Sequence, residues 1–448
     1  MVFMSPLRRQ VRKEIITLAL PVALSSLLQR AVGIVDIFLV GGLGATAIAA
    51  VGIAHLMVFL CMAVFWALSS GTTVVVAQLY GARRKEEAGK VALGALGLGV
   101  LLSIVISLAG WKFGIGGARF LGAEAAVIEL AEGYIHFIFW VFTFTALVNL
   151  FSNILYGTGD TRKPLYAVIL INILHIVIAY PLVYGHWGAP RLGIMGAAIA
   201  IGISEAAGAA VLLGLILKKK IFHTGSPAPG LLGQVIRVGL PIFGERVLQM
   251  AGQMLYLKMI MLYGTAAYAA HQVGLAIESI SFMPGLGFSI AVTAAVGHSL
   301  GARDPRRAEL LNWEANRFAV TLMAGMGVIF FFFPYVLLRI FTDDSEVIEL
   351  GTLFLKTVAI LQVPLAITMV VSGTLKGAGD TRYTFFTTVV GSWLIRVPLA
   401  YLAAVILHLP LPFVWGVMVV DWIVRMGLLL HRYRSSNWQS RSLVSGQS

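Results

Sequence analysis

Ionisable side chains interrupt the long apolar stretches of this sequence, and they are the residues best placed to carry out chemistry. The acidic ones are Asp36, Glu205, Glu245, Glu278 and Asp421. The basic ones are Arg30, Arg246, Lys258, Lys356, Arg396 and Arg425. A charge at the centre of a membrane helix costs about 2.5–3.5 kcal/mol, so such residues are paired, face water or exchange a proton. These positions therefore point to the binding and release of ions.

Asp36 is the first candidate for ion coupling. It stands among Ile34, Val35 and Ile37, about 9 Å from the outer end of its apolar run at 1.5 Å per residue. Apolar surroundings disfavour the charged form of a carboxylate, which makes Asp36 a candidate carrier of a proton. The alternative is a fixed hydrogen bond inside a packed bundle. Arg30 is six residues away from Asp36 and points to a different face of the helix.

Glu278 and Arg396 are the second candidate for ion coupling. Each lies about 12 residues, or about 18 Å, inside its apolar run, which places both near the middle of a bilayer. Two roles stay open for the pair: a structural lock between helices, or an ion-coupled site to which Arg396 contributes. Asp421 and Arg425 are spaced i,i+4, which predicts a local structural ion pair.

Four further polar residues are candidates for a substrate site or a proton relay. Asn172 and His175 are three residues apart and share a helix face, so they either bond neighbouring helices or form a relay near Asp36. Glu245 and Gln249, one turn apart, are candidates for lining a cleft. We predict no metal site, since the sequence has a single cysteine and no cluster of metal ligands.

The elements that hold these residues come as two copies of one unit. Residues 157–162 repeat as residues 377–382, and the same offset of 220 positions pairs Gln29 with Gln249 and Gly44 with Gly264. A constant offset held over so many residues indicates duplication. The repeated loop positions are Gly157, Gly159, Asp160, Thr161, Gly377, Gly379, Asp380 and Thr381.

These repeated glycine-rich loops have two interpretations. Glycine-rich loops can hold phosphates, but neither copy continues as a nucleotide-binding Gly-Lys-Ser/Thr, and both stand between apolar runs. A structural turn is favoured, in which Asp160 and Asp380 cap the following helix or pair with Arg162 and Arg382. Without a nucleotide motif, any pumping must use an ion gradient.

Composition places the chain in a lipid bilayer. The 448 residues are 59% hydrophobic and 12% charged, with a mean hydropathy of +0.90, whereas soluble domains are about 45–50% apolar and about 25% charged. The net charge of +13 sits in short loops between apolar runs, so it does not indicate nucleic acid. The first run, from Ile15 to about Gly42, is too long for a cleaved signal peptide.

The apolar runs predict an all-α integral membrane protein of twelve transmembrane helices, arranged as two parallel six-helix repeats around a central cleft. We expect an N-lobe at residues 1–217, a cytoplasmic linker at 218–234, and a C-lobe with a short tail at 235–448. Loops on the side of the N-terminus hold 23 basic residues and those on the other side 4. This asymmetry places both termini in the cytoplasm.

Together these motifs resemble the multidrug and toxic compound extrusion (MATE) transporters. The resemblance covers nearly the whole chain. The matching segments are residues 31–36, 157–161, 281–288 and 377–381. It implies a secondary antiporter in the cytoplasmic membrane that exports amphipathic organic cations in exchange for H+ or Na+. It also implies that the aspartate at position 36 couples the cation. We expect no cofactor other than the coupling ion, and a chain that acts as a monomer.

The chain departs from the family pattern in the fifth helix. The family often carries an asparagine and, four residues later, an aspartate in its fifth helix, where this chain has His175 and Ala179. A Na+ site needs several oxygen ligands, so the absence of this aspartate favours H+ as the coupling ion.

Two rival functions remain. A flippase for lipid-linked precursors would use Arg30, Arg246 and Arg396 as a basic cleft, and a membrane enzyme or receptor would need a motif that the sequence does not offer.

Overall fold

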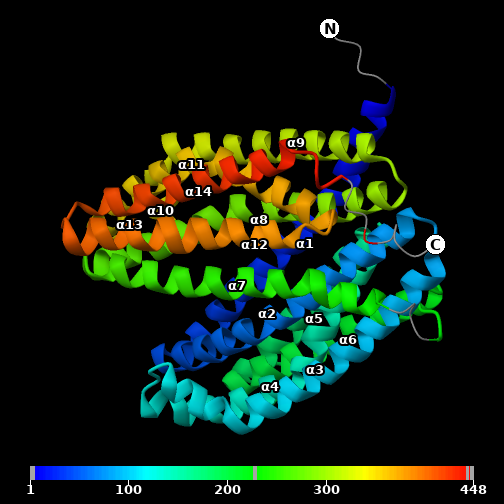
Figure 1. The fold of residues 1–448 in the computed structure, drawn as a ribbon. Coiled ribbons are helices and arrows are strands. Elements are labelled where there is room, and N and C mark those ends of the chain that lie inside the picture. The colour runs from blue at the N-terminus through cyan, green and yellow to red at the C-terminus, as the bar shows by residue number, and fades with distance from the viewer. Residues whose placement is uncertain (1–5, 226–229, 440–442, 444–448) are drawn as a thin grey trace. The chain divides into compact units, whose positions relative to one another are not determined.

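Helices form the described parts of the chain, which are residues 6–225, 230–439 and 443 of this computed structural model. The first half contains α1 Pro6–Gly41, α2 Ala45–Gly81, α3 Lys85–Phe120, α4 Ala125–Gly157, α5 Arg162–Tyr184 and α6 Ile194–Lys218 (Figure 1). The second half contains α7 Leu231–Met261, α8 Thr265–Gly301, α9 Pro305–Phe332, α10 Pro334–Arg339, α11 Ser345–Gly377, α12 Thr381–Thr388, η1 Val389–Arg396, α13 Val397–Tyr401, η2 Leu402–Ile406 and α14 Leu411–Arg434. The predicted linker and tail fall partly on residues 226–229, 440–442 and 444–448, outside the described residues.

Eleven helices within the described residues are long and apolar enough to cross a membrane, with Thr381–Ile406 counting as one. The twelfth predicted span, α7, forms a helix of 31 residues but does not reach this level of hydropathy. Glu245, Arg246 and Gln249 interrupt its apolar sequence. Because polar groups in a span are costly unless they are satisfied inside the protein, α7 needs partners for these side chains.

The chain divides into two compact units, Leu24–Gly239 and Met1–Ala23 with Leu240–Ser448. The first parts of α1 and α7 therefore pack in the unit formed mainly by the other half of the sequence. Glycines permit this close packing: a Cβ on Gly71 of α2 would lie 2.4 Å from the backbone oxygen of Val235 in α7. Likewise, a Cβ on Gly287 of α8 would lie 2.6 Å from the Cα of Ala23 in α1.

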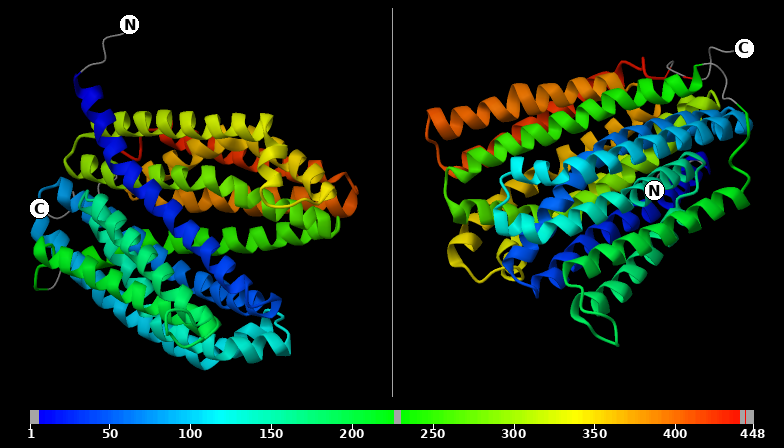
Figure 2. Two further views of the ribbon diagram at one scale, coloured as in Figure 1. Left: turned by 180° about the vertical axis from the view of Figure 1, so that it is seen from behind. Right: turned by 90° about the horizontal axis from the view of Figure 1, so that it is seen from below.

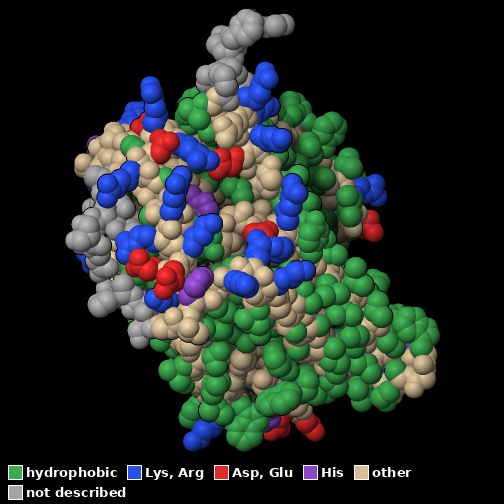
Figure 3. All heavy atoms as spheres, turned by 90° about the vertical axis from the view of Figure 1, so that its right-hand side faces the viewer, with side chains coloured by type: hydrophobic (Ala, Val, Ile, Leu, Met, Phe, Trp, Pro, Cys, Tyr) green, Lys and Arg blue, Asp and Glu red, His purple; other side chains and the backbone are tan. Residues whose placement is uncertain are grey.

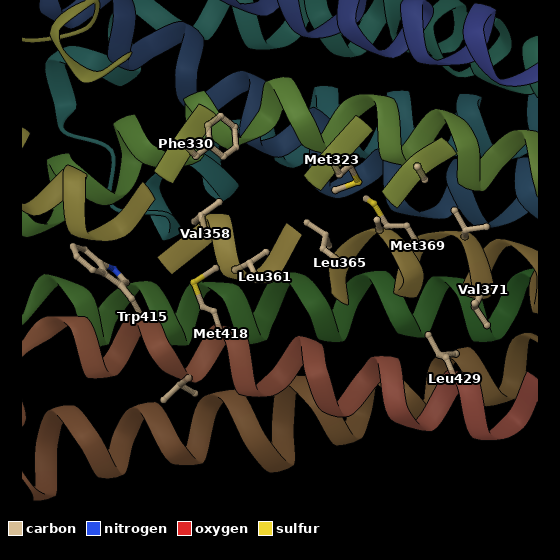
Figure 4. Close-up of a cluster of buried hydrophobic side chains, with 14 of the residues drawn as sticks. Met323, Phe330, Val358, Leu361, Leu365, Met369, Val371, Trp415, Met418 and Leu429 are labelled. Carbon is tan, nitrogen blue, oxygen red and sulfur yellow. The ribbon is translucent and has the colours of Figure 1, made fainter. Parts of the chain in front are cut away.

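In the unit that contains most of the second half, α11 is the central helix. It packs against α8, α9 and α14, and Figure 2 shows α9, α11 and α14 running alongside one another. Figure 4 shows the apolar side chains that these helices direct toward one another. They are Met323 and Phe330 of α9, Val358, Leu361, Leu365, Met369 and Val371 of α11, and Trp415, Met418 and Leu429 of α14, all buried.

In the other unit, α4 is the central helix. It contacts α2, α3 and α6, and its Phe142 ring meets Phe65 of α2 edge to face at 5.6 Å. Among the described lysines and arginines, only Arg396 and Arg425 are buried. Figure 3 shows Lys and Arg gathered over helix ends and hydrophobic side chains covering the adjoining flank. This distribution is what an apolar solvent around the flanks requires.

The duplication is visible in the backbone. Positive φ angles recur at the repeat offset: Gly44 at 103° and Gly264 at 100°, and Arg83 at 62° and Arg303 at 58°. Arginine rarely adopts such angles. The two copies therefore share turn geometry at these positions, which supports the repeat predicted from the sequence.

The repeated glycine-rich loops are helix ends. Gly159 has φ 83° and Gly379 has φ 82°, and the amides of Asp160 and Asp380 donate to the carbonyl oxygens of Leu155 at 2.9 Å and Leu375 at 2.8 Å. A left-handed glycine followed by such a bond is the common way to end a helix and satisfy its last carbonyls.

Replacing Gly159 by alanine is expected to reduce the free energy of unfolding by about 1–2 kcal/mol, because a Cβ is unfavourable at positive φ. Thermal unfolding of the purified protein in detergent measures this. Gly97→Ala is the matched control, since a Cβ there would meet nothing within 4 Å. Equal melting temperatures for the two variants would show that this turn does not limit stability.

Asp160 caps the following helix, which is one of the two roles expected of it, and its ion-pair partners within the described residues are lysines and not Arg162. Its carboxylate lies 2.5 Å from Lys219 Nζ and 3.1 Å from Lys163 Nζ, and it accepts the backbone N–H of Lys163 at 3.3 Å, as a cap would. In the second copy, Arg432 Nε donates to Asp380 at 2.8 Å. The loops therefore pair with the helices that close each six-helix copy.

This pairing should resist the acidity of a proton gradient. Burial acts to raise the pKa of Asp160, but Lys219 and Lys163 outweigh it and hold the pKa below its usual range. The stabilisation is therefore complete above the ordinary aspartate pKa of about 4 and is lost only as pH falls through the lower folded value. Asp160→Asn is expected to cost up to about 1 kcal/mol equally at about pH 7 and about pH 5.5.

Melting temperatures of the variant and of wild type at both pH values test this. Asp343→Asn is the control, because the Asp343 side chain is 93% exposed and lies 3.9 Å from Arg339. A loss present at pH 7 but absent at pH 5.5 would mean that Asp160 takes up its proton well above the expected range.

Candidate functional site

The central feature of the Leu24–Gly239 unit is a buried pair of Asp36 on α1 and His175 on α5. Asp36 Oδ1 lies 2.5 Å from His175 Nε2, and the two residues are 3% and 1% exposed. The sequence separates them by 139 positions, yet places each on the inward face of its helix. A short bond between a carboxylate and an imidazole is charge-assisted when the ring carries the proton.

Three further titratable side chains surround this pair. Tyr134 of α4 and His55 of α2 lie 3.2 Å apart, Oη to Nε2, and both interact electrostatically with Asp36. Glu205 of α6 interacts electrostatically with His175. Among the described residues, His175 Nδ1 and Glu205 Oε2 are buried without a hydrogen-bond partner. Five helices thus bring titratable groups together around one carboxylate.

α1 is attached to α5 on either side of the pair. Asn172 Nδ2 donates to the carbonyl oxygen of Leu28 at 3.2 Å, and Tyr184 Oη donates to that of Leu39 at 2.7 Å. Of the two roles considered for Asn172 and His175, hydrogen bonds between helices are present, and a share in a proton relay stays a prediction. These two bonds flank Asp36 along α1 and connect this part of the helix to α5.

The donor set around Asp36 suits a proton better than Na+. A hard cation prefers several oxygen ligands, but the nearest partner of Asp36 is an imidazole nitrogen. No group of three or more His, Cys, Asp or Glu side chains that could hold a metal occurs within the described residues.

The second buried cluster lies in the other unit and joins Arg396, Asp421 and Arg425. Asp421 Oδ2 lies 2.7 Å from Arg396 Nε, and Asp421 Oδ1 lies 2.6 Å from Arg425 Nε. The i,i+4 pair of Asp421 and Arg425 is present as expected. The wide turn of η1 brings Arg396 and Ser392 to α14, where Ser392 Oγ accepts a bond from Arg425 Nη2 at 2.7 Å.

At the end of the wide turn the Val397 N–H donates to the carbonyl oxygen of Ser392, five residues back. Pro398 follows and has no N–H of its own to donate. Such π-type turns are frequent at functional sites.

Glu278 does not form the expected ion pair with Arg396. It interacts with Arg396 electrostatically, but within the described residues the ion-pair partner of Arg396 is Asp421 on α14. The packing of η1 against α14 explains this, because it brings Asp421 closer than Glu278 on α8. Glu278 is 8% exposed.

The candidates on α7 are placed in the same unit as this cluster. The Glu245 carboxylate accepts Lys376 Nζ of α11 at 2.8 Å and Thr384 Oγ1 of α12 at 3.1 Å, so it is held by an internal ion pair. Gln249 is half-buried. Three of the bases predicted at membrane depth, Arg30, Lys258 and Lys356, are exposed.

The sequence did not point to three members of these centres. They are His55, Tyr134 and Gln253, whose Oε1 accepts a hydrogen bond from Arg396 Nη1 at 3.3 Å. It also left Glu205 without a role. A histidine inside an apolar helix was an available signal for His55. Tyr134 and Gln253 carry no such signal, because tyrosine and glutamine are ordinary in membrane helices.

Comparison with known proteins places both halves in one family. Residues 21–181 and 241–402 match the family MatE. The chain is 30% identical over 444 residues to "Probable multidrug resistance protein NorM" of Thermotoga maritima, covering 97% of this chain and 95% of that protein.

Solved structures give the same fold. A mutant of the Vibrio cholerae MATE transporter VcmN superposes with a TM-score of 0.91 at 19% identity, covering 97% of this chain and 99% of that one. A MATE in complex with MaL6 superposes with a TM-score of 0.89 at 24% identity, covering 96% and 97%.

Proposed function

This chain belongs to the MatE family of multidrug efflux transporters, multi-pass membrane proteins that are not enzymes, and from that premise we propose that it exchanges protons for amphipathic organic cations. The observation that supports H+ is the buried contact of 2.5 Å between Asp36 and His175. Both partners can hold a proton, and His175 offers nitrogen where a Na+ site needs oxygen. No other cofactor is part of the proposal.

Protonation of Asp36 would act through the bonds between α1 and α5. A proton on the carboxylate removes the charge that strengthens its bond to His175, and charged hydrogen bonds are roughly twice as strong as neutral ones. Pro21 lies inside α1 and supplies a point where the helix can bend. The change at Asp36 would thereby alter the path of α1 and favour release of the substrate.

The driving force is adequate for export. One elementary charge moving inward is worth about 2.3 kcal/mol per 100 mV, and each pH unit adds about 1.4 kcal/mol per proton.

We propose that residues 1–217 and 235–448 rock as two lobes joined by the linker at 218–234. The excess of basic residues in loops on the side of the N-terminus supports cytoplasmic termini and insertion in the cytoplasmic membrane. The chain would act as a monomer.

The ion-coupling candidate on α8 and the substrate candidates on α7 are also part of the proposal. Glu278 is the second ion-coupling candidate, and Gln249 a candidate for substrate contact. Glu245 is available to a substrate only if its pair with Lys376 opens.

Efflux from proteoliposomes carrying a H+ gradient or a Na+ gradient separately tests the proposal, with a small panel of cationic dyes as substrates. We expect dye movement with the H+ gradient alone. Movement with the Na+ gradient alone would overturn H+ coupling. Translocation of lipid-linked precursors without dye movement would favour the flippase alternative.

A further inference from the structure

The centre of the C-terminal unit is basic where that of the N-terminal unit is acidic. At the repeat offset of 220, Tyr256 occupies the position of Asp36. The Arg396 guanidinium lies 5.8 Å from the centre of the Tyr256 ring and 5.8 Å from that of Trp422. In the second copy a cation therefore lies over two aromatic faces, and one of these rings, Tyr256, occupies the sequence position of the carboxylate in the first copy.

The charges in direct contact do not balance. Asp421 is the carboxylate shared by Arg396 and Arg425, which leaves one excess positive charge in a group of residues that are 5%, 0% and 4% exposed. An uncompensated buried charge is costly by several kcal/mol. Something outside this triad must supply a negative charge.

Arg396 also has unused donors. Its Nη1 donates to Gln253 Oε1 at 3.3 Å, whereas its Nη2 has no acceptor among the described residues. Its Nε lies 2.7 Å from Asp421 Oδ2 but is not directed along a hydrogen bond. Arg425, in contrast, donates twice to Asp421 and once to Ser392. Arg396 is the guanidinium that can accept a further anionic partner.

Glu278 is the acidic residue whose protonation state sets the net charge of this centre. The other titratable or charged groups of this centre are His271 on α8 itself, Tyr256 on α7, Arg396 on η1, and Asp421 and Arg425 on α14. Glu245 of α7 also interacts electrostatically with Arg425, but its carboxylate is already paired with Lys376 at 2.8 Å. When ionised, Glu278 offsets the excess charge at a distance. When protonated, it leaves the guanidinium unbalanced. A proton on His271 would add positive charge in the same sense.

We propose that the C-terminal unit binds a compact monovalent anion, a halide or a carboxylate group, at Arg396 when Glu278 holds a proton. Water can fill an empty donor position but cannot balance the charge. The guanidinium fork suits a carboxylate, and a halide satisfies the same charge requirement. Proton and anion would therefore bind together, and each would raise the affinity for the other by the same factor.

This site does not depend on the Asp36–His175 pair, and the experiment keeps the two apart. Purified full-length protein in detergent, with methanesulfonate as the background anion, is titrated with chloride and, in a separate arm, with formate. Thermal stabilisation reports binding, since a ligand that binds the folded state raises its melting temperature. A pH indicator in weakly buffered solution reports proton uptake.

For the wild type we expect anion-dependent stabilisation whose apparent affinity falls about tenfold per pH unit on the alkaline side of a series from about pH 5 to 9. Anion addition should consume up to one proton per protein. The relative strength of the chloride and formate arms decides between a halide and a carboxylate. Asp36→Asn should leave both readouts unchanged, which separates this site from the proposed coupling site.

The variants assign the residues. Arg396→Gln should weaken anion binding at least about tenfold and abolish proton uptake, and Arg396→Lys, which keeps the charge and loses donors, should weaken it less. Arg339→Gln is the control, since the Arg339 side chain is 57% exposed. Glu278→Gln should bind the anion without pH dependence and without proton uptake.

The absence of anion-dependent stabilisation in folded wild-type protein would overturn the site. So would binding by Arg396→Gln as tight as that by Arg339→Gln. Proton uptake that persists in Glu278→Gln, and is lost in His271→Phe, would overturn the assignment of the proton to Glu278.

Discussion

Asp36→Asn is expected to abolish efflux driven by a pH gradient while leaving the protein folded and inserted. Asparagine keeps the size and one hydrogen-bond acceptor of aspartate, but it cannot take up the proton on which coupling depends. Transport that depends on the pH gradient should disappear, because the variant cannot use the roughly 1.4 kcal/mol that each pH unit supplies per proton. Dye efflux from proteoliposomes with an imposed pH gradient measures this.

Two variants sharpen the result. Glu124→Gln removes an acidic charge from an exposed position before α4, where the side chain makes no capping bond, and should transport as wild type does. His175→Asn leaves Asp36 able to titrate, so efflux should persist with a displaced pH profile. Wild-type rates in Asp36→Asn would remove this residue from the coupling mechanism.

Asp421→Ala is expected to destabilise the protein by about 3–5 kcal/mol, the cost of leaving a buried charge without its partner. Asp421 is fully buried and lies 2.7 Å from Arg396 and 2.6 Å from Arg425. Without it, two guanidinium groups would face one another without an intervening carboxylate. Chemical or thermal unfolding in detergent measures the loss.

A combined variant separates charge from packing. Replacing Asp421, Arg396 and Arg425 together by leucine, methionine and leucine removes all three charges, and well-packed apolar replacements of buried ion groups are often neutral or stabilising. We expect most of the stability to return. If Asp421→Ala unfolds as wild type does, the triad contributes little and the basic cluster must be solvated.

The two halves share a duplicated backbone but not their central chemistry. Matching turn angles at positions such as Gly44 and Gly264 show that the two copies share their turn geometry. The inward positions are then free to diverge, because each needs only a satisfied neighbour and not a particular residue type. This divergence has produced two different buried centres. One unit contains Asp36 with His175, and the other contains Arg396 with Asp421.

The sequence determined much of this protein by itself. Apolar runs long enough to cross a bilayer specify membrane helices, and a constant offset of 220 specifies the repeat, because both are one-dimensional properties of the chain. Buried charge is costly enough that each ionisable residue inside an apolar run signals a site. Asp36, Glu278 and Arg396 were therefore identifiable without coordinates.

Partners were decided only by the tertiary structure. Spacing along one helix predicts a pair such as Asp421 and Arg425, but it carries no information about a neighbour on another helix. Because η1 packs on α14, Arg396 forms its ion pair with Asp421 and not with Glu278. Helix packing likewise brought His175 to Asp36 across 139 positions, because contact between helices depends on their rotation and depth, which apolar composition leaves open.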